Sequence, residues 1–76
     1  MKTCSIMLNT INDVKKFVNI VCKYDFDVDL ISGRYAIDAK SIMGIFSLDL
    51  SKAIKLEAHS DNCDAFLEEI KPFIVD

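Results

Sequence analysis

Apolar and polar residues alternate in three stretches of the chain, and alternation is the period of a strand with one face buried. The stretches are residues 2–8, DFDVDLISGRYAIDA at 25–39 and KAIKLEAHS at 52–60. The middle stretch alternates on both sides of Ser32 and Gly33, which fall where a tight turn is needed, so it predicts a hairpin. The apolar sides hold Cys4, Ile6, Leu8, Phe26, Val28, Leu30, Tyr35, Ile37, Ile54, Leu56 and Ala58.

Between these strands the apolar residues recur every three or four positions, which is the period of a helix. A first helix is predicted over about 11–24, and Thr10 followed by Asp13 resembles a capping box with Asp in place of the usual Glu. A short apolar helix starts at Ser41, and residues 61–71 form a closing helix. The apolar stripe of the first helix holds Ile11, Val14, Phe17, Val18, Val21 and Cys22, and the second helix covers Ile42, Ile45 and Phe46.

The resulting order of elements is βαββαβα, which leaves no room for repeated right-handed crossovers. Such a mixture favours an α+β fold, in which an antiparallel sheet carries its helices on one face. A chain of 76 residues is near the lower end of what folds unaided, so we expect a single domain over residues 1–76.

Charge and cysteine content narrow the class of protein. The formal charge of −3 and the pI near 4.9 argue against a nucleic-acid partner, because that binding needs basic groups. No apolar run approaches the ~18 residues that span a bilayer, so no membrane contact is expected. Cys4, Cys22 and Cys63 are odd in number and lack CxxC spacing, which indicates reduced thiols and a cytoplasmic protein.

The chain offers little for metal or cofactor chemistry. A zinc site with the three cysteines needs a fourth ligand, and His59 is the only imidazole. Its spacing from the cysteines indicates no ligand set. We therefore expect no metal, no cofactor and no enzymatic activity.

The stretch AKSIMGIFSL at 39–48, together with this order of elements, resembles the HPr family of small histidine-containing phosphocarriers of the bacterial sugar phosphotransferase system. Its sharpest part runs from Lys40 to Gly44, and KKFV at 15–18 is a weaker match. The resemblance implies an open-faced β-sandwich of four antiparallel strands backed by three helices. After Leu50 the chain is about two residues shorter than the family pattern and lacks the glycine usual before the fourth strand.

The family's catalytic motif, however, is replaced. Counted in register from Phe17 and Ser41, the phosphoryl-accepting histidine falls on Thr10, the nearby arginine on Asn12 and the following proline on Asp13. Phosphocarriage needs a neutral nitrogen nucleophile that forms a high-energy phosphoramidate, and a threonine hydroxyl does not provide one. Nor can Asn12 neutralise a transferring phosphoryl group as a guanidinium does. We expect His59, at the far end of the sheet from Thr10, to face solvent rather than to substitute.

Ser41 can act in two ways. Serine is among the best N-cap residues, which by itself explains its place at a helix start. In many members of the family, however, a dedicated ATP-dependent kinase phosphorylates the serine of this motif, and the product docks on a transcription regulator of carbon use. By the resemblance, Ile42, Met43 and Phe46, with Thr10 and Asn12, form a partner-binding surface; a neutral Asn12 weakens the case for that regulator, because the family uses an arginine there.

Three hypotheses on function follow. The first is a non-catalytic binding or regulatory module of the sugar phosphotransferase system or of carbon regulation, switched by phosphorylation at Ser41, with a serine kinase or a transcription regulator as partner. The second is a structural or assembly domain, for instance a homodimer, with no phosphorylation. The third is a degenerate phosphocarrier.

Overall fold

The computed structural model describes residues 1–75, and its elements follow the predicted order. Strands and helices alternate along the chain much as the hydrophobic pattern indicates, and a 3₁₀ turn follows the last helix. The elements are β1 (Lys2–Ile6), α1 (Ile11–Val21), β2 (Val28–Ser32), β3 (Tyr35–Asp38), α2 (Ile42–Phe46), β4 (Ile54–Ala58), α3 (Asp64–Glu69) and the 3₁₀ turn η1 (Lys71–Phe73).

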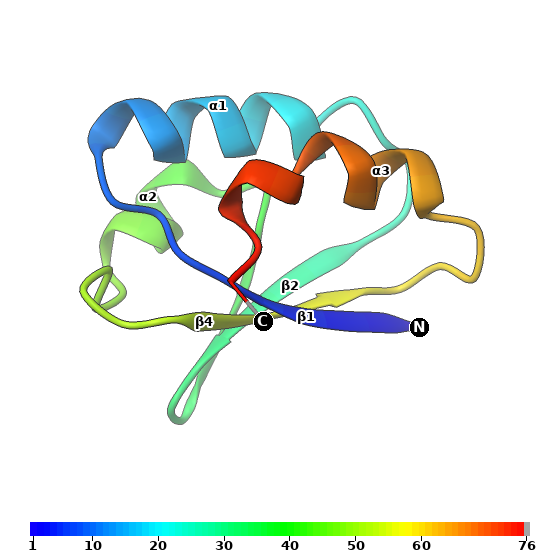
Figure 1. Ribbon diagram of the computed structural model, residues 1–76. Coiled ribbons are helices and arrows are strands. Elements are labelled where there is room, and N and C mark those ends of the chain that lie inside the picture. Colours follow the sequence, from blue (N-terminus) through cyan, green and yellow to red (C-terminus); the bar gives the residue numbers. More distant parts are fainter. Residues whose placement is uncertain (76) are drawn as a thin grey trace.

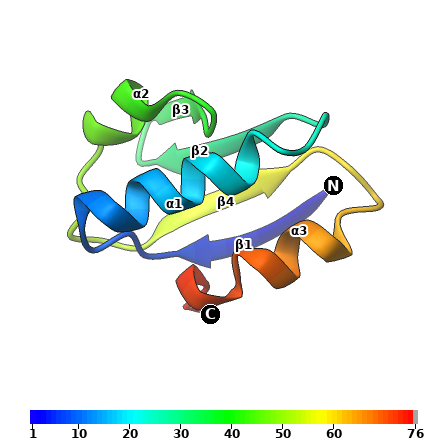
Figure 2. The same cartoon turned by 90° about the horizontal axis from the view of Figure 1, so that it is seen from above.

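The four strands form one antiparallel sheet in the order β1-β4-β2-β3. Figure 1 shows the helices stacked above one face of this sheet, while the other face is left open. Seen from above, α1 lies over the middle of the sheet and runs roughly along the strands, with α2 and α3 on either side of it (Figure 2). The predicted fold class, an α+β open-faced sandwich of four strands and three helices, is confirmed.

The core lies between the helices and the covered face of the sheet. Phe17, in the middle of α1, is fully buried, and its ring packs edge-on against that of Phe73 with centroids 6.1 Å apart. The remaining core is aliphatic, aromatic and thiol side chains drawn from every strand except β3 and from all three helices. These residues are Ile6, Leu8, Val14, Val21, Val28, Leu30, Ala39, Ile45, Ile54, Leu56, Ala58, Cys63, Phe66 and Ile70.

Three residues that the hydrophobic pattern places on apolar faces lie at the surface instead. Ile11 is 63% exposed, Tyr35 is 71% exposed, and Cys22 is also exposed. Each is at the first position of an element or just beyond the last one, where the neighbouring layer no longer covers it. Periodicity identifies the direction of a side chain but not how far the opposing layer extends.

The hairpin turn is shifted by one residue from its predicted place. Ser32 pairs with Tyr35, so Gly33 and Arg34 are the two loop residues. Gly33 has φ of 60°, and glycine at the first loop position is typical of a type II′ turn, whose twist matches that of the flanking strands. The ends of the helices also shift, since α1 ends at Val21 and α3 begins at Asp64.

The C-terminal ends of α1 and α3 are joined by a polar contact. Lys23 and Tyr24 each donate a hydrogen bond to a different carboxylate oxygen of Glu69. Because these bonds favour the ionised form, chiefly that from Lys23, they hold the pKa of Glu69 below its ordinary value. The same contact raises the pKa of Tyr24.

This contact predicts a pH dependence of stability. The unfolded chain binds the proton of Glu69 at a higher pH than the folded chain does. The stability that this contact contributes is therefore fully present above the usual glutamate pKa of about 4.3. It is lost as the pH falls through the lowered pKa of Glu69 in the folded chain. We expect Glu69→Gln to reduce the acid dependence of the free energy of unfolding, measured by urea denaturation at several pH values. Glu68→Gln is the control, because it removes the same charge from the neighbouring exposed position while Lys23 and Tyr24 stay bonded to Glu69. An equal reduction of the acid dependence in both variants would contradict the assignment.

Candidate functional site

Thr10, on which the sequence register places the histidine of the family, is the N-cap of α1. Its backbone is extended, and its Oγ1 accepts a hydrogen bond from the backbone N–H of Asp13 at 3.0 Å. The Asp13 carboxylate in turn accepts from the backbone N–H of Asn9 at 3.1 Å, one residue before the cap. The predicted capping box therefore forms in a shifted version, since the usual partner is the N–H of the cap residue itself.

This arrangement limits the chemistry of the position. Thr10 and Asn12 are both exposed, so a partner can reach them. The Oγ1 atom of Thr10 caps the helix by accepting from the Asp13 N–H. The Asp13 carboxylate lies in the same turn, where it accepts from the Asn9 N–H. A negative charge at this place opposes the approach of a phosphoryl group. The geometry suits a helix cap at an exposed contact surface.

Ser41 is the N-cap of α2 and is also exposed. Its Oγ accepts from the backbone N–H of Gly44 at 3.2 Å, and its own N–H donates to the backbone oxygen of Asp38 at 2.9 Å. Gly44 permits this close approach, because a Cβ at that position would lie 3.2 Å from Ser41 Oγ. The cap predicted from the sequence is thus present, and the hydroxyl remains at the surface.

The four large apolar residues of α2 divide between two faces of the helix. Ile45 is fully buried, and Ile42 is half-buried against the core. Met43 is 76% exposed and Phe46 is 39% exposed, three positions apart on the same side of the helix. Two of the three residues expected to form an apolar contact surface on α2 are therefore accessible, and the third is mainly structural.

The start of α1 lies beside the end of α2. The two helices are in contact, and both views place the C-terminal part of α2 beside the N-terminal turn of α1 (Figures 1 and 2). Ser41, at the start of α2, lies further along the sheet, because its N–H donates to the backbone oxygen of Asp38, which pairs with Asp29. Thr10 and Asn12 therefore belong to one end of the fold, next to the end of α2 and not to its start. His59 lies at the other end, because β1 and β4 run antiparallel with Lys2 opposite Ala58. It is exposed, as expected, and far from Thr10.

The sequence analysis missed the roles of two residues near these caps, Ile11 and Asp38. Ile11 follows Thr10 and is largely exposed, which adds an apolar side chain to this end of the molecule. The Asp38 carboxylate accepts a hydrogen bond from the backbone N–H of Lys40 at 2.9 Å. A negative charge therefore lies beside the residue that precedes Ser41. An aspartate two residues before a turn N–H is a typical Asx signal and could have indicated this contact.

Fold and site together define a small open-faced α+β sandwich with exposed, hydroxyl-capped starts of α1 and α2. The chain matches the PTS-HPr family model, described as the PTS HPr component phosphorylation site, over residues 12–76. It therefore belongs to the HPr family, the phosphocarrier-like proteins of the phosphotransferase system, whose members interact with protein partners of that system. The matched region begins two residues after Thr10.

The solved structures that are similar to the chain include three HPr proteins. HPr-C-His from Thermoanaerobacter tengcongensis has 25% identity and a TM-score of 0.79, covering 95% of this chain and 89% of that one. The phosphocarrier protein HPr of Bacillus anthracis has 21% identity and a TM-score of 0.71, with 97% and 94% covered. A Mycoplasma histidine-containing phosphocarrier protein has 17% identity and a TM-score of 0.71, with 93% and 86% covered. The last two support the fold alone. No curated protein is similar enough to match.

Hydropathy gives one further finding. Within residues 1–75, every helix is too short or too polar to cross a membrane.

Proposed function

We propose that this chain is a non-catalytic member of the HPr family that acts by contact, as a cytoplasmic binding or regulatory module of the sugar phosphotransferase system or of carbon regulation. The observation that carries the proposal is that Thr10 is a helix cap and not a histidine. The residue at the family's histidine position has its oxygen engaged in capping α1, and it lacks the imidazole that phosphoryl exchange needs.

The proposed contact surface covers the exposed side of α2 and the adjoining N-terminal turn of α1. Met43 and Phe46 supply exposed apolar area, and Thr10 and Asn12 supply short polar groups at its border. Exposed apolar side chains bordered by polar residues are typical of protein-binding sites. A serine kinase or a transcription regulator is the proposed partner, and Asn12 implies that a regulator must bind without the ion pair that an arginine would provide.

Phosphorylation of Ser41 is the proposed switch. The hydroxyl is exposed, and the first turn of α2 presents backbone N–H groups that lack partners within the helix. A phosphate at Ser41 Oγ would add two negative charges beside Met43 and close to the Asp38 carboxylate. This local change of charge would alter which partner the apolar residues of α2 can bind.

The switch is tested with the family's ATP-dependent serine kinase, and mass spectrometry locates the product. We expect one phosphate on the wild-type chain at Ser41 and none on Ser41→Asn, which retains a good N-cap residue and therefore the helix. Ser47→Ala is the matched control at the other end of α2, where Ser47 Oγ donates to the Gly44 carbonyl, and it should be modified like the wild type. An unmodified wild-type chain, beside an ordinary family member that is modified, would rule the switch out.

A further inference from the structure

The open face of the sheet carries a row of acidic residues in direct register across three strands. Asp29 on β2 is paired with Glu57 on β4 on one side and with Asp38 on β3 on the other. Like charges directly opposite one another on paired strands are destabilising, so this row favours a cation. Lys55 neutralises part of this negative charge, since its Nζ lies 3.4 Å from a carboxylate oxygen of Glu57.

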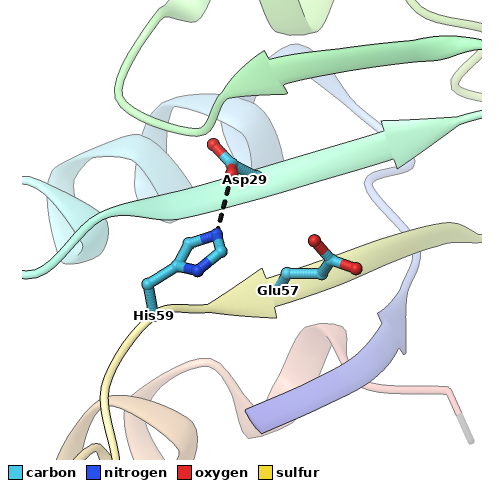
Figure 3. Close-up of side chains that lie close together, drawn as sticks. All are labelled: Asp29, Glu57 and His59. Atoms are coloured by element: carbon cyan, nitrogen blue, oxygen red, sulfur yellow. Dashed lines mark hydrogen bonds and ion pairs between the residues drawn. The ribbon is translucent and has the colours of Figure 1, made fainter. Parts of the chain in front are cut away.

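His59 completes the row with a nitrogen ligand. Figure 3 shows its ring reaching across from the end of β4 to Asp29, with the Glu57 side chain beside them and its carboxylate turned away from the ring. His59 Nε2 lies 2.8 Å from Asp29 Oδ2, and one ligand atom from each of the three residues lies within 4.8 Å of the others. A hollow of about 540 Å³ beside them is lined by Asp27, Asp29, Asp38 and His59.

We propose that His59, Asp29 and Glu57 bind a divalent transition-metal ion, with zinc as the preferred ion, on the open face of the sheet. One imidazole nitrogen and two carboxylate oxygens form a donor set that suits Zn²⁺. Ligands at about 2.0–2.1 Å from a tetrahedral ion lie about 3.3 Å apart. The His59–Asp29 pair has to open by about half an ångström, and Glu57 has to move inward; water completes the coordination.

The nitrogen ligand distinguishes a specific metal site from the nonspecific attraction of counterions to acidic residues. Mg²⁺ and Ca²⁺ prefer oxygen ligands, whereas an imidazole favours zinc, nickel and copper. Asp29 and Glu57 project from paired strands in the middle of the sheet, so their backbone positions are fixed and only the side chains have to adjust when the ion binds. This site is independent of the proposed function, because it lies on the face opposite the helices and includes neither Thr10 nor Ser41.

The experiment is a titration of the purified full chain with zinc after removal of metals, followed by calorimetry and by NMR of the histidine ring. We expect one ion per chain, with shifts at the His59 ring and at the Asp29 amide. His59→Gln and Asp29→Asn should each lower the association constant at least about tenfold. Glu68→Gln, which removes the same charge from the helix side, should change it less than twofold, and a hundredfold excess of Mg²⁺ should not displace the zinc.

Cysteine also binds zinc, so the exposed thiol of Cys22 is removed as a second control. The Cys22→Ser variant should retain the affinity and the shifts at His59. Retention of affinity within twofold in His59→Gln, loss of binding in Cys22→Ser, or equal displacement by Mg²⁺ would each overturn the proposal. Circular dichroism verifies that every variant is folded.

Discussion

Incubation with phosphoenolpyruvate and the family's upstream phosphotransferase enzyme should leave no acid-labile phosphate on this chain. The sequence register places Thr10 at the position that accepts the phosphoryl group in the family, and its Oγ1 accepts a hydrogen bond from the Asp13 N–H. A threonine hydroxyl is a weak nucleophile without an adjacent base, and its phosphate ester would be a poor donor to the next protein. Asp13 adds a negative charge to the same turn.

The measurement is labelled phosphoenolpyruvate followed by acid treatment, with a histidine-containing family member as the positive control. Acid lability separates phosphohistidine from a serine phosphate at position 41, so this result and the result with the serine kinase are independent. The double variant Thr10→His with Asn12→Arg tests the chemical reason, and we expect it to gain label that the wild type lacks. Acid-labile label on the wild-type chain would show that it is a carrier after all.

Replacing Phe17 by alanine should produce the largest loss of stability. Phe17 is fully buried at the centre of the core, and its ring packs against Phe73. Large-to-small substitutions of buried phenylalanine cost about 3–5 kcal/mol, because transfer energy is lost and a cavity remains. In a chain of 76 residues a single core rarely supplies more than about 3–5 kcal/mol, so the variant should be partly unfolded at room temperature.

Ile11→Ala is the matched control in the same helix, since the hydrophobic pattern places both residues in one stripe. Ile11 is 63% exposed, so its truncation should change the free energy of unfolding by no more than about 0.5 kcal/mol. Urea denaturation followed by circular dichroism measures both. Equal losses in the two variants would show that the N-terminal turn of α1 is buried in solution.

At the candidate site, the local sequence pattern predicts the helix caps but not which apolar side chains are exposed. The sequence correctly predicts Thr10 and Ser41 as helix caps, because a cap is a contact between residues three positions apart. The division of α2 into a buried side and an exposed side is different. Met43 and Ile45 are both large apolar residues, and only the position of α2 at one margin of the helical layer decides that Met43 stays at the surface.

By itself the sequence determined the order of elements, the antiparallel sheet with helices on one face, the burial of Phe17 and the absence of an imidazole at position 10. Each depends on periodicity or on the identity of a residue in a local motif. The tertiary structure alone decided that Ile11 and Tyr35 are exposed and that His59 meets Asp29, thirty positions away. The physical reason is that strand pairing and layer edges bring together, or leave uncovered, residues whose separation along the chain carries no signal.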